Sequence, residues 1–466
     1  MKQTHDLEFL PIGRLLLKFS IPAMAGTIIN SLYNIVDRIF LGQYVGEVGI
    51  AATTVAMPLM MIIMAIGMLI GFGTNSQISI RLGEKRHEEA EQLLGQGMFL
   101  FVVTSFAFTI LALLFIDPLL KLFGSTDGVL PFARTYLAIV VLGTLVHQIS
   151  FGANGFIRGE GNPRMAMATM LIGGIANVIL DYIFIAIMGW GMAGAAWATV
   201  IGQSISAAWV LHYYISGRST VKLRWQHFRI RPELLRSVLV MGSPSFIMNV
   251  IASVQMSLFN NQLAHFGGDN AISVMGVIMS FNMIWLMPII GMSQGMQPIV
   301  GYNYGARNFA RVRRTLFLTN IVATAMSTVF FTLVMIFPEY VFRLFIKMDS
   351  EVIPVGIDAV RRFMLSLPIV GYTIISGHYF QFTGRPKVSL ALTITRQIGF
   401  LIPALMILPE FFGLFGVWYA MPTSDLAAFI VTTFFVIREL RQLSQRTASK
   451  EYAPDDVSEN NQAREA

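Results

Sequence analysis

The sequence contains no cysteine and few charged residues. The absence of cysteine from 466 residues excludes disulfides, zinc–thiolate sites and iron–sulfur clusters. Charged residues make up 13% of the chain, about half of the roughly 25% found in soluble globular proteins. Hydrophobic residues make up 55%. A chain with so little polar surface is neither disordered nor a soluble enzyme, and this composition predicts an all-α polytopic membrane protein.

Nucleotide-binding and leader motifs are also missing from the sequence. No G-x-x-x-x-G-K-[ST] motif occurs, so we expect no ATP site, no cofactor and no enzymatic reaction. Gly159-Glu160-Gly161 lacks the strand–helix context of a phosphate loop and predicts a tight cytosolic turn. Residues 1–20 have no small-residue cleavage site, which favours a short cytosolic lead over a cleaved signal peptide.

Long apolar stretches divide the chain into segments that could each cross a bilayer. A span needs about 20 apolar residues in a helix. Charge clusters and Gly or Pro residues separate twelve such segments. The predicted spans are 15–43, 49–80, 94–117, 128–157, 164–188, 192–215, 237–264, 271–301, 315–338, 352–382, 388–409 and 414–437.

The basic residues are distributed unequally between the two sides. Twenty-five of the 33 Lys and Arg residues fall in the termini and in the loops on the same side as the termini. By the positive-inside rule, both termini are then cytoplasmic. This distribution also explains the net charge of +7 without a nucleic-acid partner.

The two halves of the chain have matching glycine and proline positions. A shift of 222 residues aligns Pro22 with Pro244 and Gly83 with Gly305, and a shift of 223 aligns 161–164 with 384–387. We therefore expect two pseudo-symmetric six-helix lobes, as in many secondary transporters. The predicted organisation is an N-lobe at 1–215, a basic cytoplasmic linker at 216–236, a C-lobe at 237–440, and a polar, disordered cytoplasmic tail at 441–466.

Two acidic residues lie inside spans of the first half, where ionisable groups are costly and usually functional. Asp37 shares a helix face with Asn30 and Tyr33, and Asp181 shares one with Asn177. Two carboxylates at similar depth, with nearby amide and hydroxyl groups, can hold one sodium ion or share a proton.

A matching depth supports this grouping. Asp37, Asp181 and Thr199 each lie eight or nine residues from a glycine at the outer end of their span. This separation is roughly 12–14 Å at 1.5 Å per residue. In the sixth span, Thr199 shares a face with Gln203 and Ser206. The alternative is that Asp37 pairs with Arg38, although adjacent helical residues point about 100° apart.

Other intramembrane polar residues have less specific interpretations. Arg396 and Asp425, in the second half, either form a buried ion pair or make a second coupling site. We interpret His147, His212 and His378 as hydrogen-bonded bundle residues rather than proton relays.

Five segments together resemble the multidrug and toxic compound extrusion (MATE) family. They are 33–42 (YNIVDRIFLG), 158–163 (RGEGNP), 177–181 (NVILD), 191–199 (GMAGAAWAT) and 297–306 (QPIVGYNYGA). The resemblance covers residues 10–440 and implies two six-helix lobes around a cleft that opens alternately to each side. It also implies that amphipathic, mostly cationic drugs or toxic compounds are exported from the bacterial cytoplasmic (inner) membrane in exchange for H⁺ or Na⁺.

The resemblance further implies roles for individual residues. The family's cation site, for H⁺ or Na⁺, corresponds to Asp37, Asn177, Asp181 and Thr199, with Tyr136 as a neighbour, and Pro22 matches a bend point. We expect the following residues to line the substrate cleft: Asn30, Tyr33, Gln203, Gln255 and Phe259.

One branch of the family has a glutamate in span seven and an aspartate in span ten. Here Gln255 takes the first position and no acid lies near Tyr372, which is closer to the DinF-like and MepA-like bacterial branch. Competing interpretations are a lipid-linked oligosaccharide flippase of related architecture, a passive channel or membrane scaffold, and a major facilitator fold.

Overall fold

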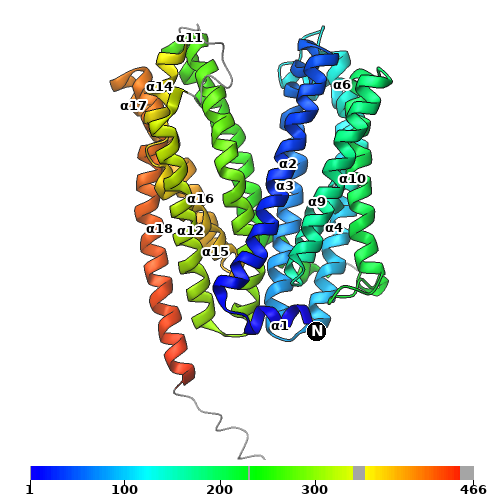
Figure 1. Cartoon of the computed structure of the whole chain (residues 1–466), viewed down its shortest axis with the longest axis vertical. Coiled ribbons are helices and arrows are strands. Elements are labelled where there is room, and N and C mark those ends of the chain that lie inside the picture. The colour runs from blue at the N-terminus through cyan, green and yellow to red at the C-terminus, as the bar shows by residue number, and fades with distance from the viewer. Residues whose placement is uncertain (1, 229–230, 340–351, 452–466) are drawn as a thin grey trace, which may run out of the picture.

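The computed structural model describes residues 2–228, 231–339 and 352–451, and in these ranges the regular secondary structure is entirely helical. Two helical bundles stand side by side (Figure 1). The first is built from α1 (Lys2–Phe9), α2 (Ile12–Tyr44), α3 (Glu47–Gly83), α4 (His87–Leu114), α5 (Ile116–Leu122), α6 (Leu130–Leu142), α7 (Thr144–His147), η1 (Gln148–Ala153), α8 (Asn154–Gly159), α9 (Pro163–Asp181), η2 (Tyr182–Ile187) and α10 (Gly191–Ile215).

The second bundle follows a connecting segment that contains the short helix η3 (Trp225–His227). Within α11, Gly268 adopts a φ of 63°, a left-handed conformation that glycine tolerates, and it bends the helix into two spans. The helices of this bundle are α11 (Pro232–Gly305), α12 (Phe309–Ile336), α14 (Val352–Phe363), α15 (Leu367–Phe382), α16 (Pro386–Ile394), η4 (Thr395–Leu401), α17 (Ile402–Phe412) and α18 (Leu414–Glu451).

The observed helices coincide with the twelve predicted spans. Among the described residues, ten helices are long and apolar enough to cross a membrane. An eleventh span is a pair, Leu130–Leu142 and Thr144–Gly159, bent by 59°. Helices α14 and α15 together occupy the predicted tenth span. The prediction of an all-α membrane protein is therefore confirmed.

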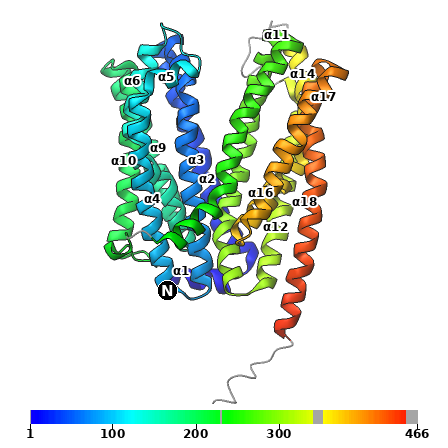
Figure 2. The ribbon, with the colours of Figure 1, turned by 180° about the vertical axis from the view of Figure 1, so that it is seen from behind.

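The end of the molecule that carries α1 and the last turns of α18 is called the terminal end below, and the opposite end the distal end. The two bundles are close together at the terminal end and diverge towards the distal end, where α5, α6, α14 and α17 lie (Figures 1 and 2). Helices α2 and α3 of the first bundle pack against α11 of the second.

The contact between bundles follows the sequence repeat. The Asn75 side chain donates a 2.7 Å hydrogen bond to Gln297, which lies 222 positions later. A Cβ on Gly83 would lie 2.0 Å from the carbonyl oxygen of Tyr302, and one on Gly305 would lie 2.1 Å from that of Ile80. Glycine at both positions lets the two backbones touch, and equivalent residues of the halves meet around one pseudo-twofold axis.

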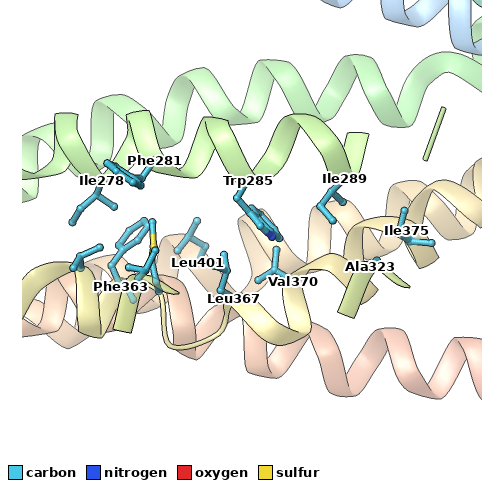
Figure 3. Packing of buried hydrophobic residues seen from close by; sticks show 14 of the residues in the cluster. Ile278, Phe281, Trp285, Ile289, Ala323, Phe363, Leu367, Val370, Ile375 and Leu401 are labelled. Atoms are coloured by element: carbon cyan, nitrogen blue, oxygen red, sulfur yellow. The ribbon is translucent and has the colours of Figure 1, made fainter. Parts of the chain in front are cut away.

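Large apolar side chains fill the second bundle. Trp285 and Phe281 project from α11 towards Phe363, Leu367 and Val370 (Figure 3). Each of these side chains is nearly or fully buried. Burying an aliphatic or aromatic side chain stabilises the fold by about 1.5–3 kcal/mol. The second bundle therefore has a well-packed hydrophobic core.

The segment between the bundles is fastened to the first one. Glu160 accepts hydrogen bonds from the backbone of Thr220 (2.7 Å) and Val221 (3.4 Å). Gln96 donates to the carbonyl oxygen of His227, and Arg224 pairs with Glu91 at 2.9 Å. Helix α11 begins at Pro232, so the non-helical connection ends earlier than the expected residue 236.

The structure differs from the sequence prediction at the C-terminal end. Helix α18 continues to Glu451, so the expectation of disorder is wrong for 441–451. These polar residues extend a helix that apolar packing has already nucleated, and propagation costs less than nucleation. Residues 452–466 of the predicted tail lie outside the described part of the chain. The turn expected at 159–161 is present, with Gly161 at a φ of 99°.

Candidate functional site

Two carboxylates are buried within the first bundle. Asp37 lies in α2 with 8% of its surface exposed, and Asp181 is fully buried at the end of α9. The two carboxylates are close enough to interact electrostatically. Helix η2, a π-helical segment, starts immediately after Asp181, and such segments often occur at functional sites.

Tyrosines from two helices adjoin this pair. Tyr33 lies one turn before Asp37 on α2, and Tyr136 is buried in α6. Tyr136 interacts electrostatically with Asp37, Asp181 and Tyr33. Tyr33 also lies against α9, because its ring would be 3.6 Å from a Cβ on Gly174. Helices α2, α6 and α9 thus bring four predicted residues into one cluster.

Asn177 and Thr199 occupy the neighbouring α9–α10 interface. Asn177 is 3% exposed and Thr199 is 7% exposed. Gly202 of α10 approaches Asn177 so closely that a Cβ there would lie 3.1 Å from the Asn177 Cβ. Asn177 is one turn before Asp181 on α9, and Thr199 is three residues before Gly202 on α10. The structure therefore places the Asn177 amide on the same helix as Asp181, and the Thr199 hydroxyl on the helix packed against it.

Several buried oxygen and nitrogen atoms of this cluster have no hydrogen-bond partner among the described residues. They are one carboxylate oxygen of Asp37, both of Asp181, and the amide oxygen and nitrogen of Asn177. Buried polar groups normally have partners, because burial without one costs free energy. A proton or a small hard cation would satisfy these oxygens.

The alternative interpretation, a pairing of Asp37 with Arg38, is reduced in the structure to an electrostatic interaction without direct contact. No ion pair joins Asp37 to Arg38, although the structure describes both residues. The Arg38 side chain instead contacts the sulfur of Met57 at 3.2 Å. The roughly 100° between adjacent helical side chains accounts for this separation.

The residues expected in the cleft and at the bend lie in different environments. Asn30, Tyr33 and Gln203 are half-buried in the first bundle. Phe259 packs against Phe363 with ring centroids 6.1 Å apart, inside the apolar core of the second bundle. Gln255 is buried and hydrogen-bonded to Gln397. Phe259 therefore has a packing role in this conformation. Pro22 is buried within a continuous α2.

The polar residues of the second bundle are mostly paired. Arg396 and Asp425 form an ion pair at 2.8 Å, in agreement with the simpler of the two interpretations. His378 shares a 2.7 Å hydrogen bond with Ser293, as expected for a bundle residue. In the first bundle, His147 stacks on Phe151, but its buried Nε2 has no hydrogen-bond partner among the described residues, so the expected hydrogen bonding is not observed there. His212 lies beside Trp209.

Sequence reasoning missed a second group of buried polar residues at the terminal end. Gln297 joins the two bundles through Asn75 and through Ser76, to which it donates at 2.8 Å. Glu160 and Arg158 are buried nearby, and although both lie in the segment 158–163 noted in the sequence, their burial was not predicted. The repeat offers the signal that could have identified the contact, because Asn75 and Gln297 are aligned by the shift of 222.

The comparisons with known proteins agree on one family. Residues 22–183 and 244–406 each match the MatE family. The chain is 26% identical over 443 residues to the "Multidrug export protein MepA" of Staphylococcus haemolyticus, covering 94% of this chain and 96% of the relative.

Two similar solved structures extend this agreement to the fold. A structure of the "MATE multidrug transporter DinF-BH" is 40% identical, with a TM-score of 0.86 and coverage of 92% of this chain and 96% of the other. An "Outward-facing conformation of a multidrug resistance MATE family transporter" is 27% identical, with a TM-score of 0.89 and coverage of 96% and 99%. The MatE family matches the chain twice, once in each bundle, as expected for a duplicated chain.

Proposed function

The chain belongs to the MatE family of multidrug transporters, and we propose that it is a cation-coupled antiporter. It exchanges H⁺ or Na⁺ for amphipathic, mostly cationic drugs or toxic organic compounds by alternating access. One observation carries the proposal: the buried pair Asp37 and Asp181 has carboxylate oxygens without hydrogen-bond partners among the described residues. Intramembrane acids of this kind mark ion pathways.

The proposal also assigns an orientation. The basic residues cluster at the terminal end, so this end faces the cytoplasm of a bacterial inner membrane. The bundles touch there and diverge at the distal end (Figure 1). The chain therefore adopts the outward-facing state of the cycle, a view supported by its similarity to an outward-facing transporter.

Coupling requires that ion and drug favour different states. With both carboxylates ionised, the first lobe attracts a cationic drug. Binding of an external H⁺ or Na⁺ lowers the negative charge of the pair and weakens this attraction. Helix α2, which carries both Asp37 and Pro22, then bends at the proline and releases the drug outwards, and the lobes rock to release the ion inwards. Asn177 and Thr199 complete the oxygen set.

A transport assay tests the proposal. Purified protein in liposomes is given a cationic fluorescent dye and either a pH gradient or a sodium gradient. We expect one gradient to drive dye movement, and Asp37→Asn to lower the driven rate by about tenfold or more, since typical couplings are about 1–3 kcal/mol. Asp127→Asn, the same change at an exposed residue, is the matched control.

Equal driven rates in wild type and Asp37→Asn would contradict the assigned site. Absence of dye movement under both gradients, in folded protein, would contradict ion-coupled drug export.

A further inference from the structure

The second bundle contains a cavity that the proposed coupling site does not use. It has a volume of about 50 Å³, enough for a small group such as a carboxylate, and lies between α11, α15 and the α16–η4 segment. A Cβ on Gly377, in its wall, would meet no atom within 4 Å, so the space at this position is open. The cavity is lined by Pro244, Ser245, Met248, Thr373, Ile374, Gly377, His378, Gln381, Ser389, Leu392, Thr393, Arg396 and Gln397.

Arg396, which is ion-paired with Asp425, contributes a guanidinium group to the cavity wall. It is the one Lys, Arg, Asp or Glu among the lining residues, whereas its partner Asp425 is not part of the lining. Both Nε (2.9 Å) and Nη2 (2.8 Å) of Arg396 contact the same carboxylate oxygen of Asp425. The other oxygen accepts a 2.7 Å hydrogen bond from Ser366. In the described part of the chain, Nη1 has no hydrogen-bond partner, so a planar donor edge remains for an anion.

Neutral donors stand beside this guanidinium. Gln397 accepts a hydrogen bond from Gln255 through its carbonyl oxygen, which leaves its NH₂ group to donate. Ser245 and Gln381 bind one another at 3.0 Å, so they are already satisfied and shape the wall. A charged donor with an adjacent amide donor is suited to bind a carboxylate.

The local backbone is irregular at these two residues. Arg396 and Gln397 are consecutive residues of η4, a π-helical segment. Such segments are short insertions in helices and are frequent at functional sites. Ser424 donates a 2.9 Å hydrogen bond to the Arg396 carbonyl oxygen, which is freed from the regular helical pattern. The irregular turn is thus stabilised by α18.

We propose that this cavity is an anion-accepting subsite, in which Arg396 and Gln397 bind the carboxylate of an amphoteric substrate. The inference rests on the proposed export function and narrows its substrate class. The first bundle has a pair of buried acids, whereas the cavity of the second has one arginine. A substrate with a cationic part and a carboxylate therefore meets acidic groups in the first lobe and the remaining Nη1 and amide donors in the second.

A matched pair of dyes isolates the carboxylate. Rhodamine B has a free carboxylate and a cationic xanthene, and its ethyl ester differs only in masking the carboxylate. Binding of each to the purified full-length protein in detergent is measured by fluorescence anisotropy. The double variant Arg396→Gln/Asp425→Asn removes the charge without leaving a buried acid unpaired. The variant Gly377→Leu fills the cavity and keeps both charges.

We expect the Kd of rhodamine B to rise by about tenfold in both variants, the equivalent of one charge-assisted hydrogen bond. The Kd of the ester stays within about twofold of wild type, a spread of less than 0.5 kcal/mol. Gly276→Leu, at another position where a Cβ would meet no neighbour, leaves both affinities unchanged. An unaltered ester affinity also shows that the variants are folded.

Equal affinity of rhodamine B for wild type and Gly377→Leu would overturn the subsite, even if the double variant does not fold. Loss of ester affinity to the same degree as rhodamine B would also overturn it, since the cavity would then not select the carboxylate. In a further outcome, liposomes show no gradient-driven transport of the ester while the variants still weaken binding of rhodamine B and not of its ester. That result would contradict the export function and would support the subsite.

Discussion

Glu160 shows how a single buried residue can depend on its hydrogen-bond partners. It lies in the turn between α8 and α9, outside the membrane-spanning segments, and is fully buried. Burial raises the pKa of its carboxyl from 4.5 to about 8, while the backbone donors of Thr220 and Val221 oppose this rise. The folded protein therefore keeps a proton on Glu160 at pH values where the unfolded chain has lost it.

This pKa predicts a pH dependence of stability. Between pH 4.5 and about 8 the folded state binds the extra proton, so the free energy of unfolding falls as pH rises through this window. The slope for one proton is at most about 1.4 kcal/mol per pH unit. Thermal unfolding of wild type and Glu160→Gln in detergent measures it. We expect wild type to lose stability relative to the variant as pH rises.

Glu88→Gln, at an exposed position, controls for the loss of a surface charge. A wild-type minus Glu160→Gln difference that is constant with pH would contradict the assigned protonation.

Individual site residues differed in how well the sequence predicted them. Asp37 and Asp181 could be identified because acids in apolar spans are rare and their depths match. Phe259 could not be placed, since an apolar residue lines a cleft or fills a core depending on the rotation of its helix. Glu160 and Arg158 lie near the ends of spans, where charge is ordinary, and burial there depends on long-range packing.

At the scale of helices, glycine positions determine how closely the bundles approach. Gly83 on α3 and Gly305 on α11 each touch a backbone carbonyl group of the other helix. The positions of helices and loops were predictable from apolar length, glycine and proline. The π-helical segments were not, because their hydrogen-bond shift depends on tertiary contacts such as that of Ser424 with Arg396.

A larger residue at Gly83 should force the bundles apart at the terminal end. Its Cβ would lie 2.0 Å from the Tyr302 carbonyl oxygen, a separation that backbone atoms can relieve only by moving. We expect Gly83→Val to shift the population towards a state closed at the distal end. The absence of native cysteine allows spin labels at Thr126 and Glu410, both exposed residues, without further changes.

Pulsed electron paramagnetic resonance then measures the distance between the labels. It should shorten in Gly83→Val and remain unchanged in Gly276→Leu, which is on α11 but away from this contact. An unchanged distribution in folded Gly83→Val protein would show that the glycine contact does not hold the conformation.

At the scale of the whole molecule, a duplicated chain carries different chemistry in its two halves. Asn75 and Gln297 meet at the axis between the bundles as equivalents in the repeat. The paired acids lie in the first lobe, and the second has the Arg396–Asp425 ion pair. Alternating access needs only that the lobes rock about their shared contact, whereas coupling needs the ion site in one of them. The repeat predicted the lobes, but not their conformation.

Coupling is the central claim, and it is reciprocal: if an ion gradient moves the dye, a dye gradient must move the ion. The most direct measurement is ion counterflow in liposomes driven by a cationic dye alone, with luminal pH and sodium recorded in parallel. We predict counterflow of one ion in wild type and in Asp127→Asn, and none in Asp37→Asn/Asp181→Asn. Dye movement without ion counterflow in wild type, or equal counterflow in the double variant, would contradict the account.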